Sequence, residues 1–144
     1  MKLSFNKIRS AFGNKDNTND SNTDNQIEDI ISSVDGDPFA ISEQNVLFAK
    51  TSELGGYFYV IAIIVGSFKI KTMKGAKLDI KGKNFNLILN SDIDEFQSDH
   101  SNVSNRYITR IDFQIEELDV SKFDKNTIAS LKLQTKKQAI VFNT

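Results

Sequence analysis

The chain has 144 residues, of which 39% are hydrophobic, enough length and apolar content for one domain with its own core. It has no cysteine, which excludes disulfides, thiolate metal sites and thiol nucleophiles. His100 is its one histidine, so a site that needs two imidazoles from the same chain is excluded as well. The chemistry that remains belongs to carboxylates, hydroxyls, amides and lysines.

The formal net charge is only −1, but the charges are segregated along the chain. Residues 13–45 hold eight acids and a single lysine, Lys15. Residues 92–105 hold four acids and neither lysine nor arginine. Residues 67–91 carry six lysines and one aspartate, and 120–144 carry five lysines and one aspartate. Such opposed blocks are more typical of recognition surfaces than of a reaction centre.

The N-terminal residues 1–12 are predicted to form a basic amphipathic segment. Phe5, Ile8 and Phe12 fall on one side of a helix, while Lys2, Lys7 and Arg9 supply three positive charges without an acid. A segment of this length is marginal as an isolated helix. We expect it either to dock on a surface or to fray, and a weak contact of residues 2–12 with a membrane surface is one alternative.

Residues 13–26 are predicted to be a flexible polar linker, because residues 13–25 contain no large apolar side chain. A short helix is expected at 27–34, where Ile27, Ile30, Ile31 and Val34 recur at helical spacing. The single β domain, with this helix leading it, is then expected to span 27–144.

No targeting or membrane segment is predicted. The N-terminus lacks the apolar run of roughly seven residues that a secretory signal needs. The most apolar stretch, residues 57–65, is far shorter than the ~20 residues of a spanning helix. We therefore expect a cytoplasmic protein without a transmembrane segment.

Beyond Phe39 the apolar pattern changes to period two, which is typical of strands. Residues 57–65 are too continuously apolar for one face of the strand to be exposed to solvent, so this strand should be central and covered on both sides. Gly66 is interpreted as a bulge, after which residues 67–90 should form an antiparallel meander of three short strands. The remaining predicted strands are 46–50, 107–115, a segment beginning at 128, and 139–142.

The pattern predicts an all-β fold: an antiparallel β-sandwich or partly open barrel of seven to eight strands, with one short N-terminal helix. A turn or short helix is expected within 118–127, held by Val120 and Phe123. The predicted core consists of alternate apolar residues, namely Phe58, Val60, Ile63, Phe68, Ile70, Leu78, Ile80, Phe85, Leu87, Leu89, Ile111, Phe113, Ile115, Phe123, Leu131, Leu133, Ile140 and Phe142.

The segment 91–102 is the first candidate site. It gathers Asp92, Asp94, Glu95 and Asp99 beside His100, an oxygen-rich set that suits a hard cation such as Ca²⁺. No glycine lies between Asp92 and Arg106, so the frame of an EF-hand is missing. A metal-binding domain using these carboxylates is one alternative, and a solvated loop whose side chains cap its own turns is the other.

The lysines of 67–90 are the second candidate. Lys69, Lys71, Lys77 and Lys81 alternate with apolar residues and should share one exposed sheet surface. Such a surface could bind nucleic acid, but the aromatic side chains that would stack on bases fall on the opposite face. A charged outer face that discourages edge pairing is the simpler interpretation, and nucleic acid is the less favoured partner.

No motif in the sequence predicts catalysis or a cofactor. Asp94 and Glu95 are adjacent and would point apart in an extended chain, and neither Ser101 nor Ser104 lies in a nucleophile elbow. The leading hypothesis is therefore a non-enzymatic binding or protein-interaction module, whose partner is another protein or a second copy of the chain.

Overall fold

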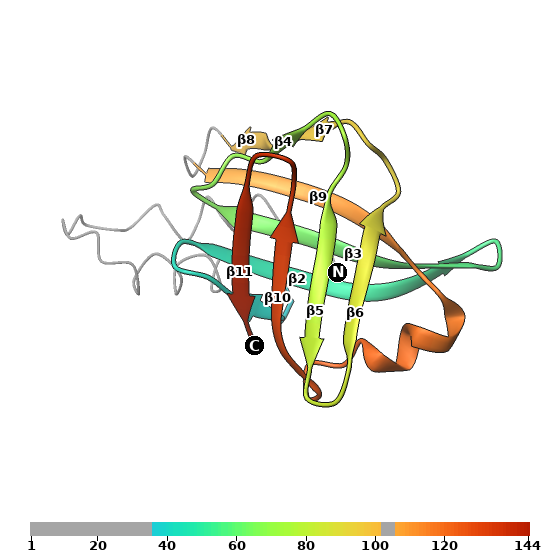
Figure 1. Ribbon diagram of the computed structural model, residues 1–144. Helices are drawn as coiled ribbons and strands as arrows, with labels where there is room; N and C mark the ends of the chain where they lie inside the picture. The colour runs from blue at the N-terminus through green and yellow to red at the C-terminus, as the bar shows by residue number, and fades with distance from the viewer. Residues whose placement is uncertain (1–35, 102–105) are drawn as a thin grey trace.

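The computed structural model describes residues 36–101 and 106–144, and this part of the chain is an antiparallel, barrel-like all-β domain (Figure 1). In the described residues eight strands close the barrel in the order β3–β2–β1–β11–β10–β5–β6–β9, and β9 pairs back to β3. Their bounds are β1 Ala40–Ile41, β2 Asn45–Leu54, β3 Tyr57–Gly66, β5 Lys77–Gly82, β6 Asn86–Ser91, β9 Arg106–Ile115, β10 Ile128–Gln134 and β11 Ala139–Asn143. The predicted all-β class is confirmed.

The barrel is flattened into two layers that cross. Figure 1 shows the long strands β2, β3 and β9 running crosswise to β5, β6, β10 and β11. Strand β3 pairs with β2 along its whole length and with β9 from Phe58 to Gly66, which confirms its predicted central position. Orthogonal layers of this kind bury the inward side chains of both sheets against each other.

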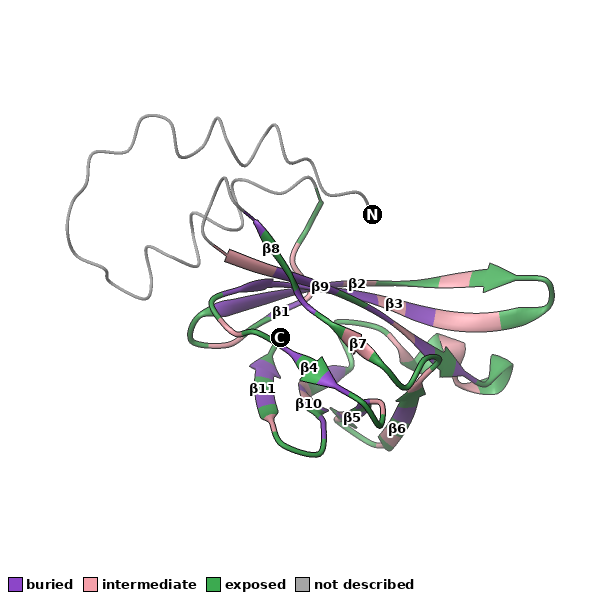
Figure 2. Cartoon of the chain, turned by 90° about the horizontal axis from the view of Figure 1, so that it is seen from above, coloured by how far each residue is buried: buried purple, intermediate pink, exposed green. Residues whose placement is uncertain are grey.

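The β2–β3 hairpin projects beyond the rest of the domain, and Figure 2 shows its tip as exposed. Gly55 and Gly56 form the turn with φ of 61° and 83°, the left-handed backbone that a two-residue type I′ turn requires. Leu54 and Tyr57 flank the turn and are 73% and 70% exposed. The hairpin therefore carries large apolar side chains into solvent.

The core lies between the two layers, where the inward residues alternate as predicted. Phe113 and Phe142 are fully buried there, on β9 and β11, whereas Phe48 of β2 is equally buried but lies outside this cluster, on the opposite face of its strand from Leu47. Of the predicted core residues, five are only partly buried: Phe58, Phe68, Phe85, Leu87 and Phe123. Several buried residues were not predicted, namely Ala40, Val46, Leu47, Phe48, Ala62, Ile64, Val65, Ala76, Ile108 and Ile128.

The predicted meander over 67–90 is only partly correct. Strands β5 and β6 pair as expected, but the segment before them does not join β5, whose other neighbour is β10. The interpretation of Gly66 as a bulge is wrong, because β3 ends there. A Cβ on Gly66 would collide with the backbone of Gln44 and Asn45, so the glycine permits close approach to the start of β2.

The segment after β6 is not simply a loop. It contains β7 (Phe96–Gln97), which pairs with β4 (Lys71–Thr72), and β8 (Asp99–Ser101), which extends the sheet beside β9. Ser98 anchors the segment to the core: its Oγ accepts a hydrogen bond from Ile70 N at 2.7 Å and lies 2.6 Å from Thr109 Oγ1. The anchoring explains why such a polar sequence is ordered.

Replacing Ser98 by alanine is expected to lower the free energy of unfolding by about 1–3 kcal/mol, because the buried Ile70 N–H loses a partner. Urea denaturation monitored by circular dichroism measures the loss. The control is Ser121→Ala on the exposed surface, which should change stability by no more than about 0.5 kcal/mol. Equal effects of the two substitutions would contradict the anchoring role.

The predicted short helix within 118–127 is confirmed as a 3-10 helix, η1 (Glu117–Lys122). Val120 and Phe123 pack against the core as expected, and the Phe123 ring stacks on Phe39 with centroids 4.7 Å apart. Lys125 Nζ also donates to the Pro38 carbonyl at 2.9 Å. The chain thus enters the described domain beside the end of η1. The segments predicted for 1–12, 13–26 and the helix at 27–34 lie outside the described residues.

Candidate functional site

Two threonine-centred turns carry lysines to one end of the barrel. Thr72 Oγ1 donates to the Gly75 carbonyl at 2.9 Å and accepts from Lys74 N at 3.2 Å. Thr135 Oγ1 accepts from Lys137 N and Gln138 N at 3.3 and 3.0 Å, in the turn between β10 and β11. Both threonines are buried, and their hydrogen bonds hold the backbone of each turn, whereas the lysines at the tip of the turn are exposed.

The Gln138 side chain holds the two turn regions together. Its Nε2 donates to the Lys69 carbonyl at 2.8 Å, and its Oε1 accepts from Lys71 N at 3.4 Å. One amide thus pairs with the backbone of residues 69–71 much as a neighbouring strand would. As a result the segment leading into β4 lies against the β10–β11 turn.

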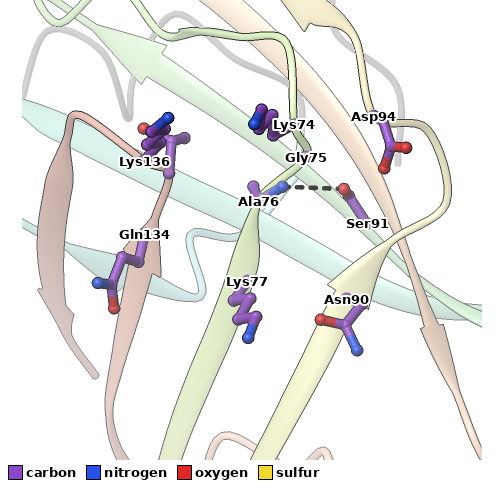
Figure 3. Close-up of a pocket in the computed structure, with 10 residues that line it drawn as sticks. Lys74, Gly75, Ala76, Lys77, Asn90, Ser91, Asp94, Gln134 and Lys136 are labelled. Atoms are coloured by element: carbon purple, nitrogen blue, oxygen red, sulfur yellow. Dashed lines mark hydrogen bonds between the residues drawn. The ribbon is translucent and has the colours of Figure 1, made fainter.

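Two adjoining cavities lie at this end of the barrel, of about 520 and 590 Å³. Both are lined by Lys74, Thr135 and Lys136. The first also includes a cross-strand row, Gln134 on β10, Lys77 on β5 and Asn90 on β6, which Figure 3 shows below the two turns. The second lies between the 71–74 segment and the β10–β11 turn, with Met73 in its lining.

Five lysines line these cavities, and we call them the basic rim: Lys71, Lys74, Lys77, Lys136 and Lys137. Asp94 is the one carboxylate among the lining residues of the two cavities. Its backbone carbonyl accepts from Gly75 N at 2.7 Å, and Ser91 Oγ accepts from Ala76 N at 3.0 Å beside it (Figure 3). The basic rim therefore carries an excess of positive charge, and hydrogen bonds hold the backbone of the segments that bear it.

The structure separates the lysines that the sequence analysis grouped. Lys71 and Lys77 belong to the basic rim. Lys69 lies next to the rim, because its backbone carbonyl accepts a hydrogen bond from Gln138. Lys81 lies about 13 Å further along β5, toward the opposite end of the barrel. Between Lys77 and Lys81 the same outer face carries Asp79, whose cross-strand partner on β10 is Lys132. This carboxylate interrupts the expected continuous lysine surface.

The acidic residues of the first candidate site are dispersed. Asp92 accepts from Gln114 Nε2 at 2.8 Å, Asp94 lies at the basic rim, Glu95 is exposed before β7, and Asp99 is in β8. Within residues 36–101 and 106–144 no three His, Asp or Glu side chains are grouped as metal ligands. The geometry therefore lends no support to the calcium hypothesis, which stays a prediction.

His100 lies in β8 opposite Tyr107 of β9, and the two rings meet edge to face with centroids 5.0 Å apart. It is exposed and outside the lining of both rim cavities. Lys136, Lys137 and the two threonines were missed as site residues. The signal available in the sequence is a threonine followed within two residues by a lysine, repeated at 72–74 and 135–137.

Comparison of the chain with protein-family models, curated proteins and solved structures finds no match. Among the described residues no helix has the length and apolar character to cross a bilayer. The fold and the site together define a β-barrel domain with a lysine-lined concave surface at one end.

Proposed function

We propose that this protein is a non-enzymatic binding module whose basic rim takes an acidic segment of a partner protein. The observation that carries the proposal is the convergence of five lysines from β4, β5 and two turns on adjoining cavities with a single carboxylate. Between described residues, ion pairs join Arg110 to Asp112 and Lys122 to Asp119, so neither neutralises the rim. The rim is therefore available to an external anion.

The size and chemistry of the cavities support a peptide ligand. Volumes of about 520 and 590 Å³ are within the range of ligand-binding clefts. Gln134 and Asn90 add exposed amide groups that can pair with a peptide backbone. Met73 is 62% exposed and offers an apolar contact, so the favoured ligand combines acidic with apolar side chains.

Nucleic acid is less favoured as the partner. The lining residues of both cavities include no aromatic side chain on which a base could stack. All five rim cations are lysines, which lack the planar fork with which arginine pairs with phosphate. An enzyme is disfavoured on similar grounds, since the lining has one carboxylate and no histidine to form an acid/base pair.

The test is fluorescence anisotropy of the full chain with three labelled probes: a glutamate-rich peptide containing leucine, a lysine-rich peptide of equal length, and a short oligothymidylate. We expect saturable binding of the glutamate-rich peptide that weakens as salt shortens the screening length to about 8 Å. The lysine-rich peptide should not bind. Tighter binding of oligothymidylate would favour nucleic acid instead, and no binding of any probe at low salt would refute the proposal.

A further inference from the structure

A second concave surface lies where β6 parts from β9. Strand β6 pairs with β5 along residues 86–90, but with β9 only at Asn90 and Ser91. Beyond these pairs the strands diverge and leave a cavity of about 500 Å³, closed on its far side by the start of β3 and by η1. We call it the splayed groove, and its lining includes Tyr57, Ile88, Asn90, Glu116 and Asp119.

The splayed groove has a mixed lining in which exposed apolar side chains lie beside acidic ones. Tyr57 and Ile88 are 70% and 53% exposed, which is unusual for large apolar side chains that lie together in one concavity. Glu116 and Asp119 supply negative charge, although Asp119 is already paired with Lys122 Nζ at 2.8 Å, and the lining residues include no lysine or arginine. Leu118, on η1 between these acids, is 89% exposed. A matching ligand is therefore apolar and basic.

Residues 2–12 of the same chain have this chemistry. Leu3, Phe5, Ile8 and Phe12 are apolar, and Lys2, Lys7 and Arg9 are basic without any acid. The helical spacing of Phe5, Ile8 and Phe12 would present them together to one surface. The other apolar N-terminal stripe, Ile27 to Val34, carries Glu28 and Asp29, which the acids of the groove would repel.

The connection of the chain permits this docking. The described domain begins beside η1, where Phe39 stacks on Phe123 and Lys125 holds the Pro38 carbonyl. Asp119 of η1 lines the groove. Phe123 and Lys125, which contact the first residues of the described domain, follow Asp119 closely in the sequence. Residues 13–35 lie between, and an extended chain of that length reaches about 75 Å, far more than the separation demands.

We infer that the N-terminal segment 2–12 docks in the splayed groove of its own chain, with its apolar stripe against Tyr57 and Ile88 and its cations beside Glu116 and Asp119. The groove shares only Asn90 with the lining of the rim cavities, so this inference is independent of the proposed function.

The absence of cysteine permits a direct test by disulfide trapping in the full chain. Ser4→Cys, four residues before Ile8 and on the same side of the expected helix, is combined with Ile88→Cys in the groove, or with Val141→Cys on β11 as the matched control, since Ile88 and Val141 are 53% and 50% exposed. We expect the groove pair to form an intrachain disulfide at least ten times faster than the control pair. Equal rates, or disulfides that form only between two chains, would overturn the inference.

The charge contribution is tested in the same assay. Adding Glu116→Lys and Asp119→Lys should slow trapping severalfold and make it less sensitive to salt. The control, Glu43→Lys with Asp99→Lys, makes the same change of net charge at exposed positions outside the groove and should leave the rate unchanged. Equal slowing by both variants would contradict docking at this groove.

A second readout does not depend on engineered cysteines. The chain has no tryptophan, so Phe5→Trp provides the sole indole. Its emission should be blue-shifted in the intact protein and should move to the red when Tyr57→Ser and Ile88→Ser are added. Both groove substitutions are at exposed positions, so the fold should persist. Emission typical of a fully hydrated indole in both proteins would refute docking.

Discussion

Phe113→Ala is expected to remove a large part of the stability of the domain. Phe113 lies on β9 with its side chain fully buried, opposite Val60 of β3 and Ser91 of β6. It therefore packs where the crossed layers meet, and truncation leaves a cavity that the paired strands on both sides cannot close. Such a change costs about 3–5 kcal/mol, against a total of about 5–15 kcal/mol for a typical domain.

Urea denaturation of the full chain measures this loss as a lower midpoint at unchanged slope. The comparison is Ile93→Ala, since Ile93 is apolar but 62% exposed, and it should change the free energy of unfolding by less than about 0.5 kcal/mol. A loss below about 1 kcal/mol for Phe113→Ala would show that the site collapses freely and that the packing described for the core is wrong.

Lys74→Glu combined with Lys136→Glu is expected to weaken binding of the glutamate-rich peptide about a hundredfold, or about 3 kcal/mol. These two lysines line both cavities of the basic rim, one from each threonine-centred turn. The change replaces two attractive charges by two repulsive ones. Because both side chains are exposed and Thr72 and Thr135 keep the turns, the melting temperature should stay nearly constant.

The control is Lys81→Glu with Lys83→Glu, an equal change of charge at exposed positions toward the other end of β5. It should weaken binding by less than about threefold, through the long-range field alone. If both double variants weaken binding equally, the ligand responds to net charge and the basic rim is not its site.

The sequence predicted the strands well where a local pattern determines them. Alternation marks β5 and β9, and the unbroken apolar run of β3 correctly indicated a central strand. The expected cover on both faces is wrong for the start of β3, where Tyr57 is exposed and Phe58 and Tyr59 are only partly buried. The errors arose where the chain leaves a sheet. Phe68 and Ile70 alternate with lysines as in a strand, yet β3 ends at Gly66, which is paired with Asn45, the first residue of β2.

The candidate site was less accessible to sequence reasoning. Local turn chemistry marks Lys74-Gly75 and Lys136-Lys137, but their adjacency follows from the pairing of β10 with β5, across more than fifty residues of sequence. The order of strands in a closed sheet is not encoded in period-two alternation. For the same reason the splayed groove, which depends on β6 and β9 diverging, left no signal in the sequence.

In the two threonine-centred turns, different residues hold the backbone and face solvent, which affects how the sequence can change during evolution. Thr72 and Thr135 are buried and supply the hydrogen bonds, whereas Lys74, Lys136 and Lys137 are exposed at the tips. Stability and ligand preference thus depend on different residues of the same short segments. The tips can be exchanged for other side chains at little cost in stability, so the barrel is a scaffold on which new specificities can be selected one turn at a time.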